Sequence, residues 1–109
     1  MMSEDLTFYT GAGEDVYAAV RNFTVGGLPA DATTYTPTLA MISDGDVVME
    51  ADWQAATWVE DALVPTATAF FEFVDEGRFW LYLLLVGPTD APREQLPVQV
   101  CRVLVKATP

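Results

Sequence analysis

Paired carboxylates are the residues of this sequence with the clearest chemical potential. The pairs are Asp44 with Asp46, Glu60 with Asp61, and Asp75 with Glu76. Two carboxylates can perform acid–base catalysis when their environments separate their pKa values. These pairs fall in segments typical of turns, where solvated charge is the ordinary explanation. The chain also has no histidine, the usual general base and zinc ligand. We therefore expect a protein that is not an enzyme.

Two kinds of binding site are weaker alternatives. The sequence "SDGD" at 43–46 offers two acids for calcium, fewer ligands than the roughly six to eight oxygens that calcium takes. A carbohydrate site could use hydroxyl and phenol groups together with nearby tryptophans. The candidates are Thr7, Tyr9, Thr10, Tyr17 and Tyr35. No cysteine pair, phosphate-binding loop or nucleophile elbow is present, so we expect no cofactor and no metal.

Composition limits the class of protein and its partners. The chain has 109 residues, is 51% hydrophobic and carries a net charge of −11, which favours a single globular domain over 1–109. Phosphate groups would be repelled, so we expect neither nucleic acid nor membrane as a partner. The acidic start "MMSEDLTF" does not match a secretion signal. The lone Cys101 excludes an internal disulfide.

The elements that position these residues follow from evenly spaced turn signals. Short runs rich in Val, Phe, Tyr and Thr lie between them, a pattern typical of antiparallel strands in a sandwich or barrel. We predict seven strands, at 5–10, 14–23, 37–43, 46–53, 66–74, 78–87 and 97–106. Asp44-Gly45 suits a two-residue hairpin turn. Residues 51–65 form either one short helix, since their apolar residues share a helical face, or a loop or short strand.

The run "FWLYLLLV" at 79–86 is apolar on both faces of a strand. One alternating set is Phe79, Leu81, Leu83 and Leu85, which we assign to the core. We predict that the other set faces outward and contacts a partner protein, because it would form an apolar patch at or near the largest that is typical of a soluble monomer. That set is Trp80, Tyr82, Leu84 and Val86, with Val100 and Leu104 from the neighbouring strand. In the alternative, residues 51–65, with Trp53 and Trp58, fold over this face.

Charged residues set the direction of the other strands. Glu72 should point outward, which turns Ala69, Phe71 and Phe73 inward, and Arg102 likewise turns Cys101, Val103 and Val105 inward. Val16, Ala18 and Val20 complete the expected core. From 37–43 the contribution is either Leu39 with Met41 or Ala40 with Ile42.

Three stretches carry a family resemblance. "DEGRFWL" at 75–81 resembles the start of the sixth strand of immunoglobulin-like domains, with Phe79 as the corner aromatic and Leu81 in the core. "DLTFYTGAGEDVYAAVRNFTVGGLPADAT" at 5–33 resembles the opening of immunoglobulin-like modules on tailed-virus (phage) particles. "EGRFWLYLLLVGPTDAPREQLPVQVCRVLV" at 76–105 resembles their closing strand pair.

This resemblance implies an all-β, immunoglobulin-like antiparallel β-sandwich of about seven strands. It further implies a virion structural protein of the tail, baseplate, neck or capsid decoration, assembled in the host cytoplasm. Its partners would be other virion proteins or copies of itself in a multi-copy assembly. The alternative is a carbohydrate- or calcium-binding adhesion module.

Overall fold

The computed structural model describes residues 6–11, 13–87 and 98–107, which form ten strands and two short 3-10 helices. The strands are β1 (Leu6–Tyr9), β2 (Gly13–Ala19), β3 (Thr24–Val25), β4 (Leu28–Pro29), β5 (Thr36–Ser43), β6 (Gln54–Ala55), β7 (Thr57–Trp58), β8 (Thr66–Glu72), β9 (Gly77–Val86) and β10 (Val98–Lys106). The 3-10 helices are η1 (Ala32–Thr34) and η2 (Glu50–Asp52). Residues 5 and 97 of the expected strands lie outside the described ranges.

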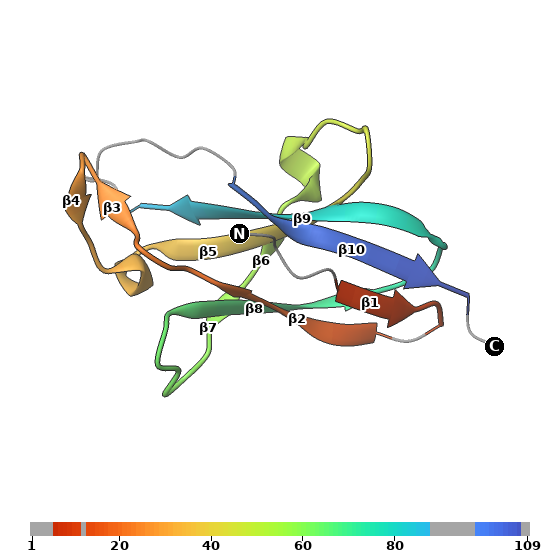
Figure 1. Cartoon of the computed structure of the whole chain (residues 1–109), viewed down its shortest axis with the longest axis horizontal. Helices are drawn as coiled ribbons and strands as arrows, with labels where there is room; N and C mark the ends of the chain where they lie inside the picture. Colours follow the sequence, from red (N-terminus) through yellow and green to blue (C-terminus); the bar gives the residue numbers. More distant parts are fainter. Residues whose placement is uncertain (1–5, 12, 88–97, 108–109) are drawn as a thin grey trace.

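Two sheets pack face to face, as Figure 1 shows with β9 and β10 above β8 and β2. The larger sheet has the order β1-β10-β9-β5-β6, and the smaller has the order β2-β8-β7. This is the immunoglobulin arrangement, in which the larger sheet corresponds to strands G, F, C and C′ with one added strand, and the smaller to B, E and D. The predicted all-β, immunoglobulin-like sandwich is confirmed. The larger sheet is mixed rather than wholly antiparallel, because β1 runs parallel to β10.

The core lies between the sheets and follows the predicted alternation. Leu39 and Leu81 have no exposed surface, and Val16 and Val103 are almost fully buried. The inward sets predicted from Glu72 and Arg102 are confirmed: Ala69, Phe73, Cys101, Val103 and Val105 are buried, and Phe71 packs against them. The alternative for 37–43 resolves in favour of Leu39 and Met41 as the core-facing pair.

The predicted strand at 46–53 is wrong. The turn itself is present, because the Asp46 N–H donates to the Ser43 carbonyl at 2.9 Å and Gly45 has a φ of 93°. The chain then runs through an irregular stretch and η2 before it pairs again with β5, at Gln54–Ala55. The hairpin therefore has a long connection, residues 44–53, instead of a two-residue loop.

No α-helix forms in 51–65 either. This stretch crosses from one sheet to the other: β6 pairs with β5 of the larger sheet, and β7 pairs with β8 of the smaller. The Trp58 Nε1–H donates to the Tyr35 carbonyl at 2.9 Å, and the ring packs against the core. Pairing with two different sheets requires extended backbone, which overrides the weak helical periodicity.

One carboxylate has a defined local role. Asp31 caps η1, since its Oδ1 accepts hydrogen bonds from the Thr33 hydroxyl at 2.7 Å and from the Thr33 backbone N–H at 3.0 Å. These bonds favour the ionised form and hold the pKa of Asp31 below its ordinary value.

Candidate docking face on the larger sheet

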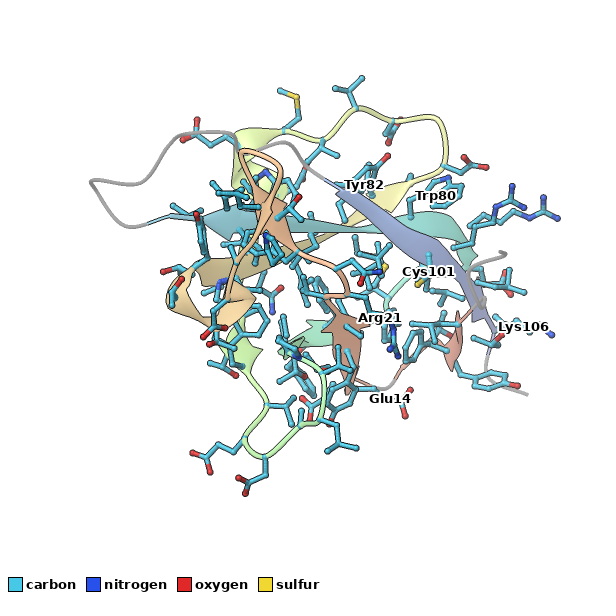
Figure 2. The ribbon with its side chains drawn as sticks, turned by 60° about the vertical axis from the view of Figure 1, so that its left-hand side comes forward. Glu14, Arg21, Trp80, Tyr82, Cys101 and Lys106 are labelled. Atoms are coloured by element: carbon cyan, nitrogen blue, oxygen red, sulfur yellow. The ribbon has the colours of Figure 1, made fainter. Side chains whose placement is uncertain are left out.

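The outward side of β9 carries the side chains that the alternation predicts. Leu81 and Leu83 are buried between the sheets, so Trp80, Tyr82 and Leu84 point to the opposite side, where they are partly exposed. Figure 2 shows Trp80 and Tyr82 on the side of β9 that faces the connection 44–53. The prediction that these side chains contact a partner stays a prediction.

Part of this outward side is covered by the chain itself. Ala40 and Ile42 of β5 lie opposite Tyr82 and Trp80 in register, and therefore on the same side of the sheet. Their exposed fractions are only 0% and 4%. The connection 44–53 arches over the larger sheet (Figure 1), and η2 contacts β5. The covering segment is thus 44–53, and its last residues, 51–53, are also the first residues of the stretch 51–65 named in the sequence alternative.

Val100 does not belong to the outward side. The register between β10 and β9 shifts between Gln99 and Cys101, which is a β-bulge. Because the bulge inserts one residue, strict alternation fails there, and Val100 packs against the core. Leu104 lies beyond the bulge, opposite Arg78, and remains on the outward side as predicted.

A depression of about 500 Å³ opens beside Trp80, at the start of the covering segment. Its lining comes from β1, β9, β10 and the turn after β5: Thr7, Asp44, Arg78, Phe79, Trp80, Arg102, Val103 and Leu104. The Arg102 guanidinium lies 5.2 Å from the centroid of the Trp80 ring, a cation–π contact. The Trp80 Nε1–H donates to Asp44 Oδ1 at 3.2 Å.

Positive charge gathers on this side of an acidic molecule. The structure describes four basic side chains, and three of them take outward positions on β9 and β10: Arg78, Arg102 and Lys106. Figure 2 shows Arg21 well away from Trp80. Within the described ranges, no carboxylate lies at ion-pairing distance from Arg78 or Arg102. We define the docking face as Trp80, Leu104, Arg78 and Arg102, with Leu84 and Val86 continuing it along β9.

Sequence reasoning missed the two arginines. Arg102 served only to mark the outward direction, because an isolated charge on a strand is normally solvated. A usable signal was present. Basic residues are scarce in this chain, yet Arg78 lies at the start of the aromatic strand β9 and Arg102 lies within its neighbour β10.

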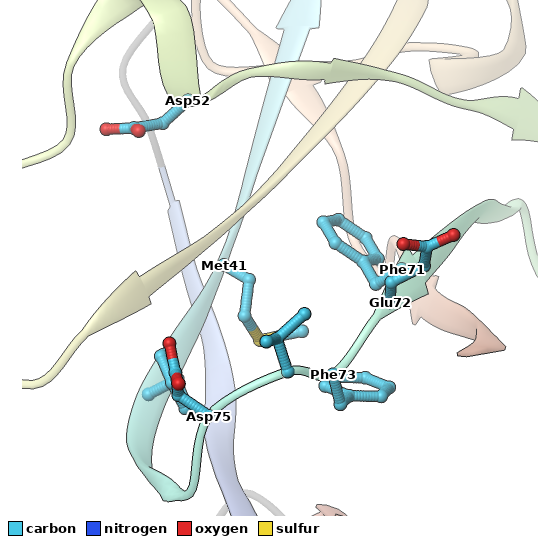
Figure 3. A pocket seen from close by; sticks show the side chains of 8 residues that line it. Met41, Asp52, Phe71, Glu72, Phe73 and Asp75 are labelled. Carbon is cyan, nitrogen blue, oxygen red and sulfur yellow. The ribbon is translucent and has the colours of Figure 1, made fainter. Parts of the chain in front are cut away.

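A second hollow, of about 260 Å³, opens between the sheets near the β8–β9 turn. Met41, Phe71, Phe73 and Phe79 line it together with Val74 and the acids Asp52, Glu72 and Asp75. Figure 3 shows these three carboxylates at separate positions around the rim rather than directed at one point. Asp52 Oδ2 also accepts a hydrogen bond from the Met49 N–H. The arrangement does not provide a joint cation site.

The other candidate residues are dispersed. Tyr9 lies on the larger sheet, Tyr17 lies on the smaller sheet, and Tyr35 follows η1, so the three phenols come from three separate elements. Asp44 of the calcium candidate is bonded to Trp80, and among the described residues no group of three potential ligand side chains is close enough to hold a metal ion. No helix in the described part of the chain has the length and apolar character to span a membrane.

The sequence matches no model of a known protein family and no curated protein. Among solved structures, the BTLA ectodomain is similar to this chain at 12% identity, with a TM-score of 0.48 and coverage of 99% of this chain and 93% of that one. The strand order and register of this chain define its fold independently of that likeness.

Proposed function

We propose that the protein is a non-enzymatic β-sandwich that docks onto a larger protein assembly through its docking face. The observation that carries the proposal is the pairing of Trp80 with Arg102 beside an open depression. Tryptophan and arginine are enriched among the residues that dominate protein interfaces, because they bring large contact area and several hydrogen-bond donors. The rest of the acidic surface keeps the free molecule soluble.

Burial of the apolar part of this face supplies the driving force. Removal of apolar area from water is worth about 25 cal/mol per Å² before the costs of association. The covering segment 44–53 already buries Ala40 and Ile42, so contact is centred on the β9–β10 side rather than on β5. A stable interface of about 800 Å² per partner would extend beyond the depression, along Leu84 and Val86.

In its more specific form, the assembly is the virion of a tailed virus, and the protein is a tail, baseplate, neck or capsid-decorating part present in several copies. Support comes from the resemblance of 5–33 and 76–105 to immunoglobulin-like modules of such particles.

Sedimentation with matched variants tests this function. The face variant is Arg102→Glu with Leu104→Ser. The control is Arg21→Glu with Leu28→Ser, which makes the same changes at exposed positions that do not line the depression, Leu28 being 70% exposed. In lysate of the source cells, wild type and control should sediment with a large particle containing structural proteins, and the face variant should remain in the monomer fraction.

Equal sedimentation of face variant and control would refute docking through this face. A monomeric wild type that binds in a glycan array or a calcium titration would instead favour the adhesion alternative. Circular dichroism of all three proteins shows whether each is folded.

A further inference from the structure

Arg78 and Arg102 both line the depression, and neither forms an ion pair with a carboxylate of the described residues. Arg102 lies opposite Trp80, and Arg78 is two residues away on the same strand as Trp80. The two arginines are therefore diagonal neighbours on adjacent antiparallel strands, a relationship that places side chains roughly 7–8 Å apart. Each guanidinium has five N–H donors in a planar fork that fits a carboxylate.

A carboxylate of the chain already lies at the edge of this depression. Asp44 accepts the indole N–H of Trp80, but it is not within ion-pairing distance of Arg78 or Arg102. The depression thus accommodates a carboxylate at its aromatic edge, and within the described part of the chain no other carboxylate pairs with either arginine.

The charge and the apolar residues around the depression favour one class of anionic ligand over another. The net charge of −11 repels a dense polyanion such as a nucleic acid. A single carboxylate is affected mainly by charges within the Debye length, about 8 Å at physiological salt. The lining of the depression holds two arginines and one carboxylate, Asp44. Leu104 lines the depression, and Leu84 and Val86 lie on the same outward side further along β9, so the face suits apolar side chains in the same ligand. Both features fit a peptide segment that alternates acidic and apolar residues.

We infer that the depression beside Trp80 is a carboxylate subsite, in which Arg78 and Arg102 bind an Asp or Glu side chain from an acidic–apolar segment of the partner. This inference rests on the docking function proposed above and specifies the chemistry of the partner.

The test is a peptide titration of the ¹⁵N-labelled full chain. The probe is the acetylated and amidated peptide Glu-Leu-Glu-Leu-Glu, and its matched control replaces each Glu by Gln. The readout is the indole N–H resonance of Trp80, assigned with Trp80→Phe. At physiological salt the acidic peptide should shift this resonance saturably and bind about ten-fold more tightly than the Gln peptide. Arg78→Gln and Arg102→Gln should each weaken binding roughly two- to five-fold, as expected for exposed ion pairs, and Arg21→Gln should leave it unchanged.

Three results would overturn the subsite. Equal affinity for both peptides would mean that charge is not recognised. An equal shift with inorganic phosphate would indicate a general anion site. A shift with protein concentration alone would mean that a second copy occupies the face. If neither peptide binds while the face variant still fails to sediment with the particle, the docking function stands and only the carboxylate subsite is lost.

Discussion

Arg102 of β10 lies directly opposite Trp80 of β9, with its guanidinium carbon 5.2 Å from the centroid of the indole ring. The carboxylate of Asp44 accepts a hydrogen bond from the indole N–H of the same ring. The indole is therefore held from two sides before any partner arrives. Such pre-ordering lowers the entropy cost of binding, because little rotamer freedom is left to lose.

The cation–π contact should make a small contribution to stability. Arg102→Gln is expected to lower the free energy of unfolding by about 0.5–1 kcal/mol, the range for exposed contacts of this kind. Arg21→Gln is the matched control, since Arg21 lies away from the docking face, and should change stability less. Urea unfolding followed by tryptophan fluorescence measures both. Equal effects of the two variants would mean that the contact with Trp80 adds nothing.

The covering segment should make Ile42 as sensitive as a core residue. Ile42→Ala should cost about 2–4 kcal/mol, in the range for buried aliphatic side chains, although Ile42 lies on the outward side of the larger sheet. Val47→Ala, in the same connection but with Val47 77% exposed, should stay within about 0.5 kcal/mol of wild type. Thermal unfolding of both variants provides the comparison. A cost below about 1 kcal/mol for Ile42→Ala would show that 44–53 does not seal this part of the sheet.

The bulge in β10 predicts opposite behaviour for two aliphatic residues on the same strand. Val100→Ser should destabilise the fold by about 1–3 kcal/mol, because Val100 packs against the core. Leu104→Ser should cost less than Val100→Ser, since Leu104 lies on the outward side, and it should weaken docking instead. A denaturant titration measures both variants. A larger loss of stability for Leu104→Ser than for Val100→Ser would contradict the bulge and support the strict alternation that the sequence suggests.

The cap at Asp31 predicts a pH dependence. Because hydrogen bonds from Thr33 lower the folded-state pKa of Asp31, folding favours the ionised carboxylate. Its stabilisation is complete above the unfolded-state pKa near 3.8 and is lost as the pH falls through the lower folded-state pKa. Asp31→Ala should therefore be less stable than wild type at pH 7, and the difference should shrink towards about pH 2. Urea titrations at both pH values test this, and a difference independent of pH would contradict it.

The sequence predicted the layers of the sandwich because charged residues fix the direction of each strand. Glu72 and Arg102 were sufficient to turn Ala69 and Val103 inward. Alternation failed at Val100, where a bulge depends on pairing with another strand and leaves no mark in the local pattern. The path of 44–53 was missed for a related reason: Val47 and Val48 suit a strand, but on this edge β5 pairs only at Thr38 and Leu39, with Ala55 and Gln54, and such long-range pairing leaves no local mark.

The docking face was only partly predictable. Trp80 and Leu104 followed from periodicity, whereas the closeness of Arg102 to Trp80 depends on the register between β9 and β10. Register is set by the sum of many cross-strand contacts, and a single sequence does not display it.

Hydroxyl-radical footprinting of the free chain and of the chain in its assembly tests the central claim most directly. Trp80 reports on the docking face, and Tyr17, 55% exposed on the smaller sheet, is the internal control. Docking through β9 and β10 predicts that the oxidation rate of Trp80 falls several-fold on assembly while that of Tyr17 is unchanged. An unchanged rate at Trp80 with protection of Tyr17 would place the interface on the smaller sheet and contradict the account.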